Sequence, residues 1–468
     1  MRLAPALLAA SALSGCAAGT DYVRPSVSLP ASYQATGTIA APDAQWWRRF
    51  GDPLLDTLVE TALAQNLEVA AATARVDQSR AAAAASGAAL LPSLDLAASA
   101  ERTRQSLRTP VGAVASRLDL PRDYSLYTVG PQASWELDLF GGLRRGREAA
   151  RADYAAASAT ADAVRLSVAA ETADAYLQLR GLQAQYAVVA QQLETERQLA
   201  ALVRQQAEQG LVAERTLHRV LGESAGLEAS LAPLRAAIAG QIHRLDVLTG
   251  RPAGSDPLHL ATIRTVPDAP DPSGSAVPSD LMRRRPDLVA AERRLAASSA
   301  RIGVSIANYY PRLSLNALLG FASIGTGGLF TSGGLQASGG AGLRWRLFDF
   351  GRVDADVVRA RGQEAEALAQ FRGAVLTATA EVETAINRLA EARTEIDLRA
   401  QQVASLARAR DQARQGYAGG ALSLIDVLDA DRALLEATDR LAGARADAAR
   451  ASVAAIRALG GGWETRNG

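Results

Sequence analysis

The stretch TVGPQASWELDLFGGLRRG, residues 128–146, contains the change of pattern on which the fold depends. Up to residue 139 its side chains alternate between apolar and polar, which predicts a β-strand with two chemically different faces. From residue 143 the chain runs to about residue 209 without proline and is rich in Ala, Leu, Arg, Glu and Gln, which predicts one very long helix. The apolar side of the strand holds Val129, Ala133, Trp135, Leu137 and Leu139, and the polar side holds Thr128, Gln132, Ser134, Glu136 and Asp138.

The same pattern occurs a second time further along the chain. Matching residues in the two halves are separated by the same number of positions, from the matched tryptophans to the matched glycines. Both halves therefore hold elements of equal length, which predicts two structural repeats. In the second half we expect a strand over 335–347 and a helix from Arg352 to about Arg414, and weaker strands over 93–105 and 311–321. The matched pairs are Trp135 with Trp345, Phe140 with Phe350, and Gly210 with Gly420.

Both long helices carry a seam of apolar residues, which recur every seven residues in the second half and at alternating steps of three and four in the first. A sustained heptad predicts packing against partner helices, as in a coiled coil. At 1.5 Å per residue each helix would extend roughly 90 to 100 Å. The seam does not distinguish a simple antiparallel hairpin from one wall of a larger helical barrel. Its residues are Leu179, Leu182, Tyr186, Val189 and Leu193 in the first half and Val375, Val382, Leu389, Ile396 and Val403 in the second.

The four expected strands have about the length that a tilted strand needs to cross a bilayer core. Four strands cannot close a barrel, because small barrels need about eight, and open edges in lipid would leave backbone groups without partners. Three chains would supply twelve strands. A soluble antiparallel sheet with one wet face is the alternative that the pattern leaves open. In a barrel we expect the lumen to be faced by Gln132, Ser134, Glu136, Asp138, Arg344 and Arg346, and lipid by Trp135, Leu137, Trp345 and Leu347.

The chain begins with the features of a bacterial secretory signal. Residues 1–15 contain an early arginine, an apolar stretch and small residues just before Cys16. This order resembles a lipobox, after which Cys16 would become an acylated first residue. An ordinary signal followed by an incidental cysteine is the alternative. Downstream there is no run of about 18 apolar residues, so no membrane-spanning helix is expected.

Composition gives no indication of an enzyme. The formal net charge of +1 offers no basic surface for nucleic acid, and a single cysteine excludes an internal disulfide. The three histidines have no metal-ligand spacing, and the glycine-rich stretch 325–334 lacks the Lys-Ser/Thr of a phosphate loop. We therefore expect no catalytic residues, no metal and no cofactor.

The expected organisation has six segments. Proline is frequent between the halves, which predicts an extended connection there. The segments are a signal peptide at 1–15, a lipid-anchored N-terminal segment at 16–60, a first repeat at 61–252, a Pro-rich linker at 253–278, a second repeat at 279–460 and a C-terminal tail at 461–468.

Several motifs resemble those of the TolC-like outer-membrane efflux factors, especially the NodT-type lipoprotein branch. They are DYVRP at 21–25, WWRRFGDPLL at 46–55, LTGRP at 248–252, RRPD at 284–287, AERRL at 291–295, YYP at 309–311 and the stretch 420–432. The likeness covers almost the whole mature chain. It implies a homotrimer with a twelve-stranded outer-membrane barrel, a long periplasmic helical barrel, and an equatorial belt built from the chain ends and the linker.

The resemblance also implies a function and partners. The channel would be a passive exit duct for small molecules, with a periplasmic adaptor (membrane fusion protein) at the helix tips and an inner-membrane pump of the resistance-nodulation-division (RND) type as its energy source. Two other functions stay open: the exit duct of a type I protein secretion system, which shares the fold, and a soluble periplasmic coiled-coil adaptor or scaffold.

In this family the periplasmic tips close by inward-pointing apolar and acidic residues. The resemblance puts Ile425 and Asp429 at these gate positions, next to Asp426. Three copies of Asp429 would form an acidic ring that favours cations. The alternative is a carboxylate that only caps or solvates the tip turn.

The repeat places two arginines opposite the gate positions. Arg215 and Arg219 are the repeat partners of Ile425 and Asp429. We expect these arginines to pair with Asp426 or Asp429 and to latch the closed state. Exposed pairs contribute only about 0 to 1 kcal/mol each, so such a latch would be weak and would open readily.

Overall fold

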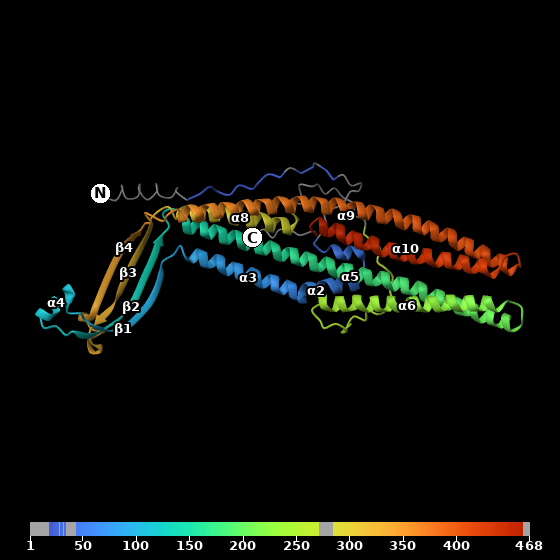
Figure 1. Cartoon of the computed structure of the whole chain (residues 1–468), viewed down its shortest axis with the longest axis horizontal. Coiled ribbons are helices and arrows are strands. Elements are labelled where there is room, and N and C mark those ends of the chain that lie inside the picture. The colour runs from blue at the N-terminus through green and yellow to red at the C-terminus, as the bar shows by residue number, and fades with distance from the viewer. Residues whose placement is uncertain (1–17, 28, 31, 34–43, 271–283, 462–468) are drawn as a thin grey trace. The chain divides into compact units, whose positions relative to one another are not determined.

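The computed structural model describes residues 18–27, 29–30, 32–33, 44–270 and 284–461 (Figure 1). The chain divides into two compact units, each drawing on both halves of the sequence. The first, called the sheet unit, consists of Met1–Pro25, Asp77–Ala155 and Glu292–Ala369. The second, called the helical unit, consists of Ser26–Val76, Ala156–Ala291 and Gln370–Gly468.

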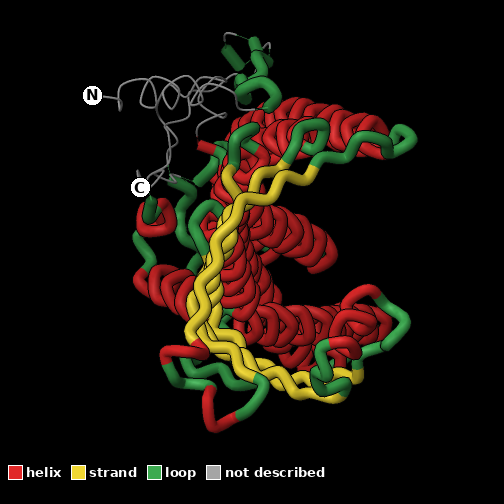
Figure 2. The backbone as a smooth tube through the Cα atoms, turned by 90° about the vertical axis from the view of Figure 1, so that its left-hand side faces the viewer, coloured by secondary structure: helices red, strands yellow, loops and turns green. Residues whose placement is uncertain are grey.

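The sheet unit contains one four-stranded antiparallel sheet in the order β1-β2-β3-β4. Figure 2 shows it as a curved ribbon that does not close on itself. β1 and β4 therefore have a neighbouring strand on one side only. Helix α4 (Pro110–Arg117) lies in the β1–β2 connection, and the 3-10 turns η3 (Thr326–Gly328) and η4 (Ser332–Gly334) lie in the β3–β4 connection. The strands are β1 Ser93–Arg104, β2 Asp123–Leu137, β3 Arg312–Ser323 and β4 Leu335–Arg344.

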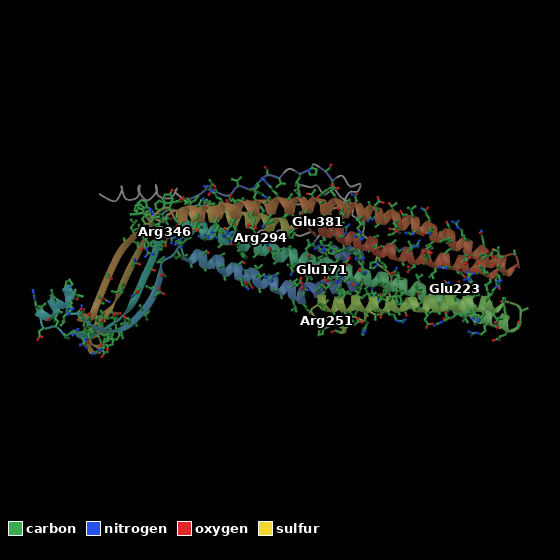
Figure 3. All side chains as sticks on the ribbon, viewed as in Figure 1. Glu171, Glu223, Arg251, Arg294, Arg346 and Glu381 are labelled. Carbon is green, nitrogen blue, oxygen red and sulfur yellow. The ribbon has the colours of Figure 1, made fainter. Side chains whose placement is uncertain are left out.

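Two strands end earlier than the alternation of side chains predicts. β2 ends at Leu137 and β4 at Arg344. The prediction that Asp138 belongs to a strand is wrong. Its carboxylate accepts the backbone N–H groups of Leu143 and Arg144 and so caps the following helix. The residues that follow the strands instead of belonging to them are Asp138, Leu139, Trp345, Arg346 and Leu347, of which Arg346 is labelled in Figure 3.

The helices confirm the repeat predicted from the sequence. α5 and α9 have 67 residues each, α6 and α10 have 35 each, and α3 and α8 have 22 each. The predicted long helices are therefore confirmed, although α9 continues beyond the predicted end at Arg414. The helices are α2 Pro53–Gln65, α3 Leu67–Ala88, α5 Gly142–Glu208, α6 Glu214–Leu248, α8 Pro286–Ala307, α9 Arg352–Ala418 and α10 Leu424–Ala458.

Two equivalent junctions join helix ends inside the helical unit. At the first, the Asn66 side chain caps α3 by accepting two backbone N–H groups and donates to the carbonyl of Leu248, at 3.0 Å, where α6 ends. At the second, Nη1 of Arg285 donates to the carbonyl of Ala458, at 3.1 Å, where α10 ends. Asn66 and Arg285 directly precede the equivalent helices α3 and α8, and Leu248 and Ala458 are the last residues of the equivalent helices α6 and α10. Two different side chains therefore hold the same backbone arrangement.

A glycine in the left-handed region lies at each junction. Gly250 has φ +73° and Gly460 has φ +93°. A Cβ on Gly250 would lie 2.5 Å from the carbonyl oxygen of Gln65, and one on Gly460 would lie 2.7 Å from that of Arg284. Both the backbone angle and the close approach therefore require glycine.

The core of the helical unit includes the motif at 46–55. Trp46 and Trp47 are buried and meet edge to face in the 3-10 helix η2 (Trp46–Phe50). Asp52 caps α2 and also accepts the hydroxyl of Tyr176 on α5. The N-terminal motif is thus fastened to a long helix by both burial and a hydrogen bond.

The heptad seam of α9 packs as predicted. Val375, Val382 and Leu389 are buried, and Ile396 and Val403 are half-buried. The seam therefore faces other helices along much of its length. Within the described ranges, no helix combines the length and the apolar character needed to span a membrane.

We predict that Gly250→Ala destabilises the protein more than Gly210→Ala does. Gly210 has nearly the same φ, +72°, but a Cβ there meets open space. The left-handed conformation costs about 1–2 kcal/mol in both variants, and the contact with Gln65 adds about 1–3 kcal/mol in the first. Thermal unfolding followed by circular dichroism measures the difference, and equal Tm values would contradict the close contact.

Candidate functional site

The strand register sorts the side chains of the sheet onto two faces. Residues paired directly across strands share a face, so Gln132 lies beside Asp95, and Trp135 lies beside Leu315. The apolar face carries Leu94, Leu96, Ala133, Trp135, Leu137, Leu315, Leu319 and Leu343. The opposite face carries Asp95, Ser99, Gln132, Ser134, Glu136, Asn316, Ser338 and Arg344. The division predicted for β2 and β4 therefore extends across all four strands.

The apolar face is largely uncovered in the single chain. Leu94 is 73% exposed, Leu96 76% and Leu343 65%. An apolar surface that continues over four strands marks a site of interaction with lipid or protein. The sheet therefore presents one face suited to an apolar environment and one suited to water.

The two tryptophans make the same contact in the two repeats. Nε1 of Trp135 donates to the carbonyl of Leu90, and Nε1 of Trp345 donates to the carbonyl of Tyr309, each at 3.0 Å. Both carbonyls follow the last turn of a helix, α3 or α8, where backbone acceptors lack partners within the helix. The tryptophans thus tie helix ends to the sheet, a role that the alternation pattern does not reveal.

The turns between the long helix pairs form two helix tips, residues 209–213 and 419–423. On α10 the predicted gate residues Ile425 and Asp429 are one turn apart and share a face. Ile425 is 43% exposed and the Asp429 side chain 65%, whereas Leu424 is buried. The two positions chosen by resemblance thus lie together on the exposed side of the α10 tip.

Asp426 has a different role from its neighbours. Its carboxylate accepts the hydroxyl and the backbone N–H of Ser423, which closes a capping box at the start of α10. The hydrogen bond from the Ser423 side chain lowers the pKa of Asp426. The expected pairing of Asp426 with an arginine is absent among the described residues, because the helix cap occupies this carboxylate.

Arg219 connects the two helix tips. Its guanidinium lies 3.1 Å from Asp429 of α10 and 3.1 Å from Glu223 of its own helix. Glu223 is labelled in Figure 3. Arg215 is exposed, and within the described ranges it forms no ion pair. Of the two arginines expected at the tip, only Arg219 contacts a predicted gate residue.

A buried carboxyl lies behind the tips. Glu196 of α5 is 3% exposed, and its Oε1 is fully buried without a hydrogen-bond partner in the described structure. Burial, followed by the nearby charges of Glu223 on α6 and Asp431 on α10, raises the pKa of Glu196 to about 7. Asp431 is itself buried but is held by Arg414, with both oxygens at 3.1 Å. Among the described residues, no cation pairs with Glu196, whereas Glu223 and Asp431 each have an arginine partner.

The signal that could have revealed this group is a difference between the repeats. Glu196 and Asp431 correspond to Leu406 and Leu221 in the opposite repeats. A leucine at the matching position indicates a buried site, and an acid at such a site costs free energy unless it is neutral or paired. The hydrophobic pattern of each half alone does not show this.

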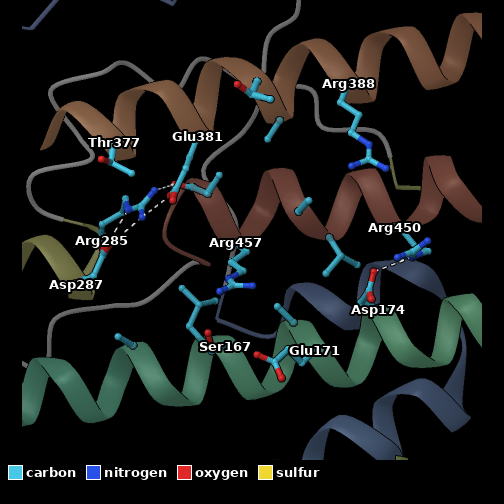
Figure 4. Close-up of a pocket in the computed structure, with 18 of the residues that line it drawn as sticks. Ser167, Glu171, Asp174, Arg285, Asp287, Thr377, Glu381, Arg388, Arg450 and Arg457 are labelled. Atoms are coloured by element: carbon cyan, nitrogen blue, oxygen red, sulfur yellow. Dashed lines mark hydrogen bonds and ion pairs between the residues drawn. The ribbon is translucent and has the colours of Figure 1, made fainter. Parts of the chain in front are cut away.

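An open cavity of about 1050 Å³ lies among α5, α9, α10 and the start of α8 in the helical unit (Figure 4). Its charges are mostly paired: Arg285 binds Asp287 and Glu381, each at 2.7 Å, and Arg450 binds Asp174 at 2.8 Å. The labelled side chains converge from different helices. These pairs hold the helices together around a polar cavity.

The N-terminal motif of the sheet unit meets the motif at 291–295. The hydroxyl of Tyr22 donates to Glu292 at 2.8 Å, and Glu292 is buried. The buried Arg145 binds Asp21 at 2.8 Å. Motifs far apart in the sequence therefore lie side by side, whereas Cys16, the predicted lipidation site, lies outside the described residues.

Comparison with known proteins shows the same arrangement over nearly the full length. Residues 58–251 and 277–461 match the family model described as outer membrane efflux protein. The sequence is 32% identical to the pyoverdine export outer membrane protein OpmQ of Pseudomonas putida, over 94% of this chain and 93% of that one. It is 29% identical to nodulation protein T of Rhizobium leguminosarum bv. trifolii, over 96% and 95% of the two chains.

The fold is similar to that of a solved outer-membrane channel, OprN. The TM-score is 0.86 at 32% sequence identity, and the match covers 96% of this chain and 100% of that chain. The MtrE outer membrane channel of Neisseria gonorrhoeae is similar as well, with a TM-score of 0.81 at 25% sequence identity over 96% of this chain and 98% of that chain. The predicted fold class is therefore confirmed: a mainly helical chain with four strands and two structural repeats.

The state of Glu196 predicts how stability at the tips depends on pH. Because folding raises its pKa from that of an ordinary glutamate to about 7, the stabilising neutral form is fully present at acidic pH and is lost as the pH rises through 7. Hydrogen exchange of residues 190–225 should speed up between pH 6 and 8.5, after correction for intrinsic exchange. Glu196→Gln should slow exchange at pH 8.5 by about tenfold.

The exposed Glu194 on the same helix provides the control. Glu194→Gln should leave the pH dependence unchanged. If Glu196→Gln leaves the pH dependence of the wild-type protein intact, Glu196 is already ionised in the folded state and the assignment fails.

Proposed function

The chain belongs to the outer membrane efflux protein family, and from this premise we propose that three copies build the passive exit duct of a tripartite efflux pump for small molecules. The observation that carries the proposal is a sheet with one apolar face and two open edges. In lipid an open edge is unfavourable, because its N–H and C=O groups find no water. Pairing β4 of one copy with β1 of the next gives both edges a partner.

The internal repeat supplies the register of this pairing between copies. The repeat relates β2 to β4 and β1 to β3, and the hairpins β1–β2 and β3–β4 have equivalent registers. Within one chain β2 pairs with β3, for example Ala133 with Ala317. The repeat equivalent of Ala133 is Leu343, and that of Ala317 is Ala98. The same pairing between copies would therefore place Leu343 of one copy opposite Ala98 of the next.

An exposed aromatic ring supports contact at the same edge. Phe140 stacks on Tyr310 with ring centroids 4.5 Å apart. Its repeat partner Phe350 is fully exposed in the single chain, and the repeat partner of Tyr310 is the exposed Leu91. By the same repeat argument, Phe350 of one copy would pack on Leu91 of the next and lose its contact with water.

The remaining parts of the assembly follow from the family. We place the protein in the outer membrane with a large periplasmic portion, anchored by acylation of Cys16. An adaptor would dock at the helix tips, and an inner-membrane pump of the RND type would supply energy. The relative OpmQ is named as a pyoverdine export outer membrane protein, which supports an export duct over a soluble adaptor and pyoverdine-like cargo over protein.

The helix tips would form the periplasmic gate. Ile425 and Asp429 lie on one exposed face of α10, and three copies of Asp429 around the axis would make an acidic constriction that favours cations. The ion pair of Arg219 with Asp429 holds the two tips of one chain together. Because both side chains are exposed, we propose a weak latch that a docking partner releases easily.

Disulfide crosslinking tests the assembly. In a Cys16→Ser background, the pair Ala98→Cys and Leu343→Cys should produce covalent trimers under mild oxidation. The pair Leu94→Cys and Leu343→Cys keeps the same face but shifts the register by about 13 Å along the strand, and should crosslink far less. Monomers only, or equal yields from both pairs, would contradict the proposed closure of the sheet.

Conductance in planar bilayers tests the latch. Arg219→Ala should increase the open probability or the conductance, by up to about tenfold in open probability if three weak pairs act together. Arg215→Ala is the matched control, because Arg215 is also an exposed arginine at the same tip but has no ion pair in the described structure. Unchanged conductance of Arg219→Ala would rule the latch out.

A further inference from the structure

The two strand connections of the sheet differ sharply in charge. The β3–β4 connection, residues 324–334, contains no charged residue, whereas the β1–β2 connection and the ends of its strands contain five arginines. Because the helices and hairpin registers match between the repeats, this difference is local to the connection. We call residues 102–122 the basic loop, and its arginines are Arg102, Arg104, Arg108, Arg117 and Arg122.

The register places two of these arginines at the border of the apolar face. In β1 the residues that share a face with Leu94 and Leu96 are, further along the strand, Arg102 and Arg104. The apolar face thus becomes cationic where β1 reaches the basic loop. Arginines in this position extend their apolar stems along apolar surface and keep the guanidinium at the polar boundary.

Helix α4 presents apolar side chains outward. Gly112 is buried, and a Cβ there would lie 1.8 Å from the carbonyl oxygen of Ser106, so this side of the helix is fixed against its own loop. Val111 is 69% exposed and Val114 56%. Leu118, just after the helix, is 65% exposed. The loop therefore combines exposed apolar groups with cations.

Several of these cations have little to neutralise them. Arg104 lies 3.8 Å from Asp123, and Nε of Arg122 donates to the carbonyl of Gln105. Within the described ranges, Arg108 and Arg117 form neither a hydrogen bond nor an ion pair through their side chains. Their guanidinium groups are free to bind an anion, and Arg favours phosphate because of its planar set of donors.

We propose that the basic loop docks on the phosphate-bearing headgroups of an anionic lipid, with Arg108 and Arg117 binding phosphate and the exposed side chains of α4 entering between the acyl chains. This inference rests on the proposed function, which puts the apolar face of the sheet in a bilayer. Apolar residues beside arginines on a short helix are the composition of an interfacial segment. The continuity of the loop with the apolar face favours a lipid surface over a soluble partner.

Lipid binding by the purified full-length protein tests the proposal. In detergent we would titrate bisphosphorylated lipid A and the same lipid without its phosphates, and follow binding by native mass spectrometry. The phosphorylated lipid should bind at least about tenfold more tightly, and 0.5 M salt should weaken this preference. Arg108→Gln with Arg117→Gln should reduce affinity for the phosphorylated lipid by about tenfold.

A charge-matched variant separates the loop from net charge. Arg75→Gln with Arg235→Gln removes two exposed arginines elsewhere and should bind lipid A like the wild-type protein. Val114→Ser should weaken binding of both lipids. Equal affinity for the two lipids, an unaffected loop variant, or equally tight binding of soluble inositol hexakisphosphate would overturn the proposal.

Spin labels distinguish failure of this inference from failure of the proposed function. A label at Leu315→Cys on the apolar face should be accessible to oxygen, and one at the neighbouring Asn316→Cys on the polar face should be accessible to a water-soluble nickel reagent. If both labels contact water equally, the sheet does not lie in lipid and the proposed function itself fails. If the labels differ and the loop variant still binds lipid A normally, only the basic loop is misassigned.

Discussion

Every backbone N–H and C=O group needs a hydrogen-bond partner, and this requirement limits the environments in which the sheet is stable. A four-stranded sheet with one apolar face has two edges, β1 and β4, that no strand covers within the chain. In water such edges are satisfied by solvent, but in lipid they are not. The apolar surface on β1 to β4 makes water an unfavourable environment for one face. In the proposed assembly, further copies complete the sheet, so that the edges have hydrogen-bond partners and the apolar face can lie in lipid.

Because of the internal repeat, the proposed contact between copies would resemble a contact that already exists within one chain. Equivalent contacts recur in both halves: the tryptophan indoles bind equivalent carbonyls, and Asn66 and Arg285 bind the equivalent carbonyls of Leu248 and Ala458. A chain that already contains the β2–β3 contact contains a template for the contact between copies. Phe350 is fully exposed in the single chain, whereas its repeat partner Phe140 is stacked on Tyr310, a difference that agrees with the proposed contact between copies.

The helix tips depart from this symmetry, because the two repeats differ there in their charged residues. Asp429 forms an ion pair with an arginine of the other repeat, whereas the carboxylate of Asp426 belongs to a helix cap. Glu196 occupies a position that is leucine in the other repeat, and in the described part of the chain its Oε1 has no hydrogen-bond partner. Exposed ion pairs are weak and a buried carboxyl is costly when ionised. The tips are therefore less firmly held than the junctions, where side chains bind helix-end carbonyls and two glycines lie in close contact with neighbouring backbone.

The sequence alone determined the repeat, the long proline-free helices, the heptad seams and the two-faced strands, because each depends on local periodicity that a single segment displays. The choice of Ile425 and Asp429 as gate residues came from the family resemblance and not from local periodicity. Tertiary structure decided where strands stop and which polar groups meet. Asp138 looked like a strand residue until its carboxylate was seen to cap α5, and the tryptophans looked like surface aromatics until their indoles were seen to bind helix-end carbonyls. Comparison of the repeats marks Glu196 as an acid at a leucine position, but only the tertiary structure places Glu223 and Asp431 beside it. A hydrogen bond or the environment of a buried charge depends on residues that are distant in sequence.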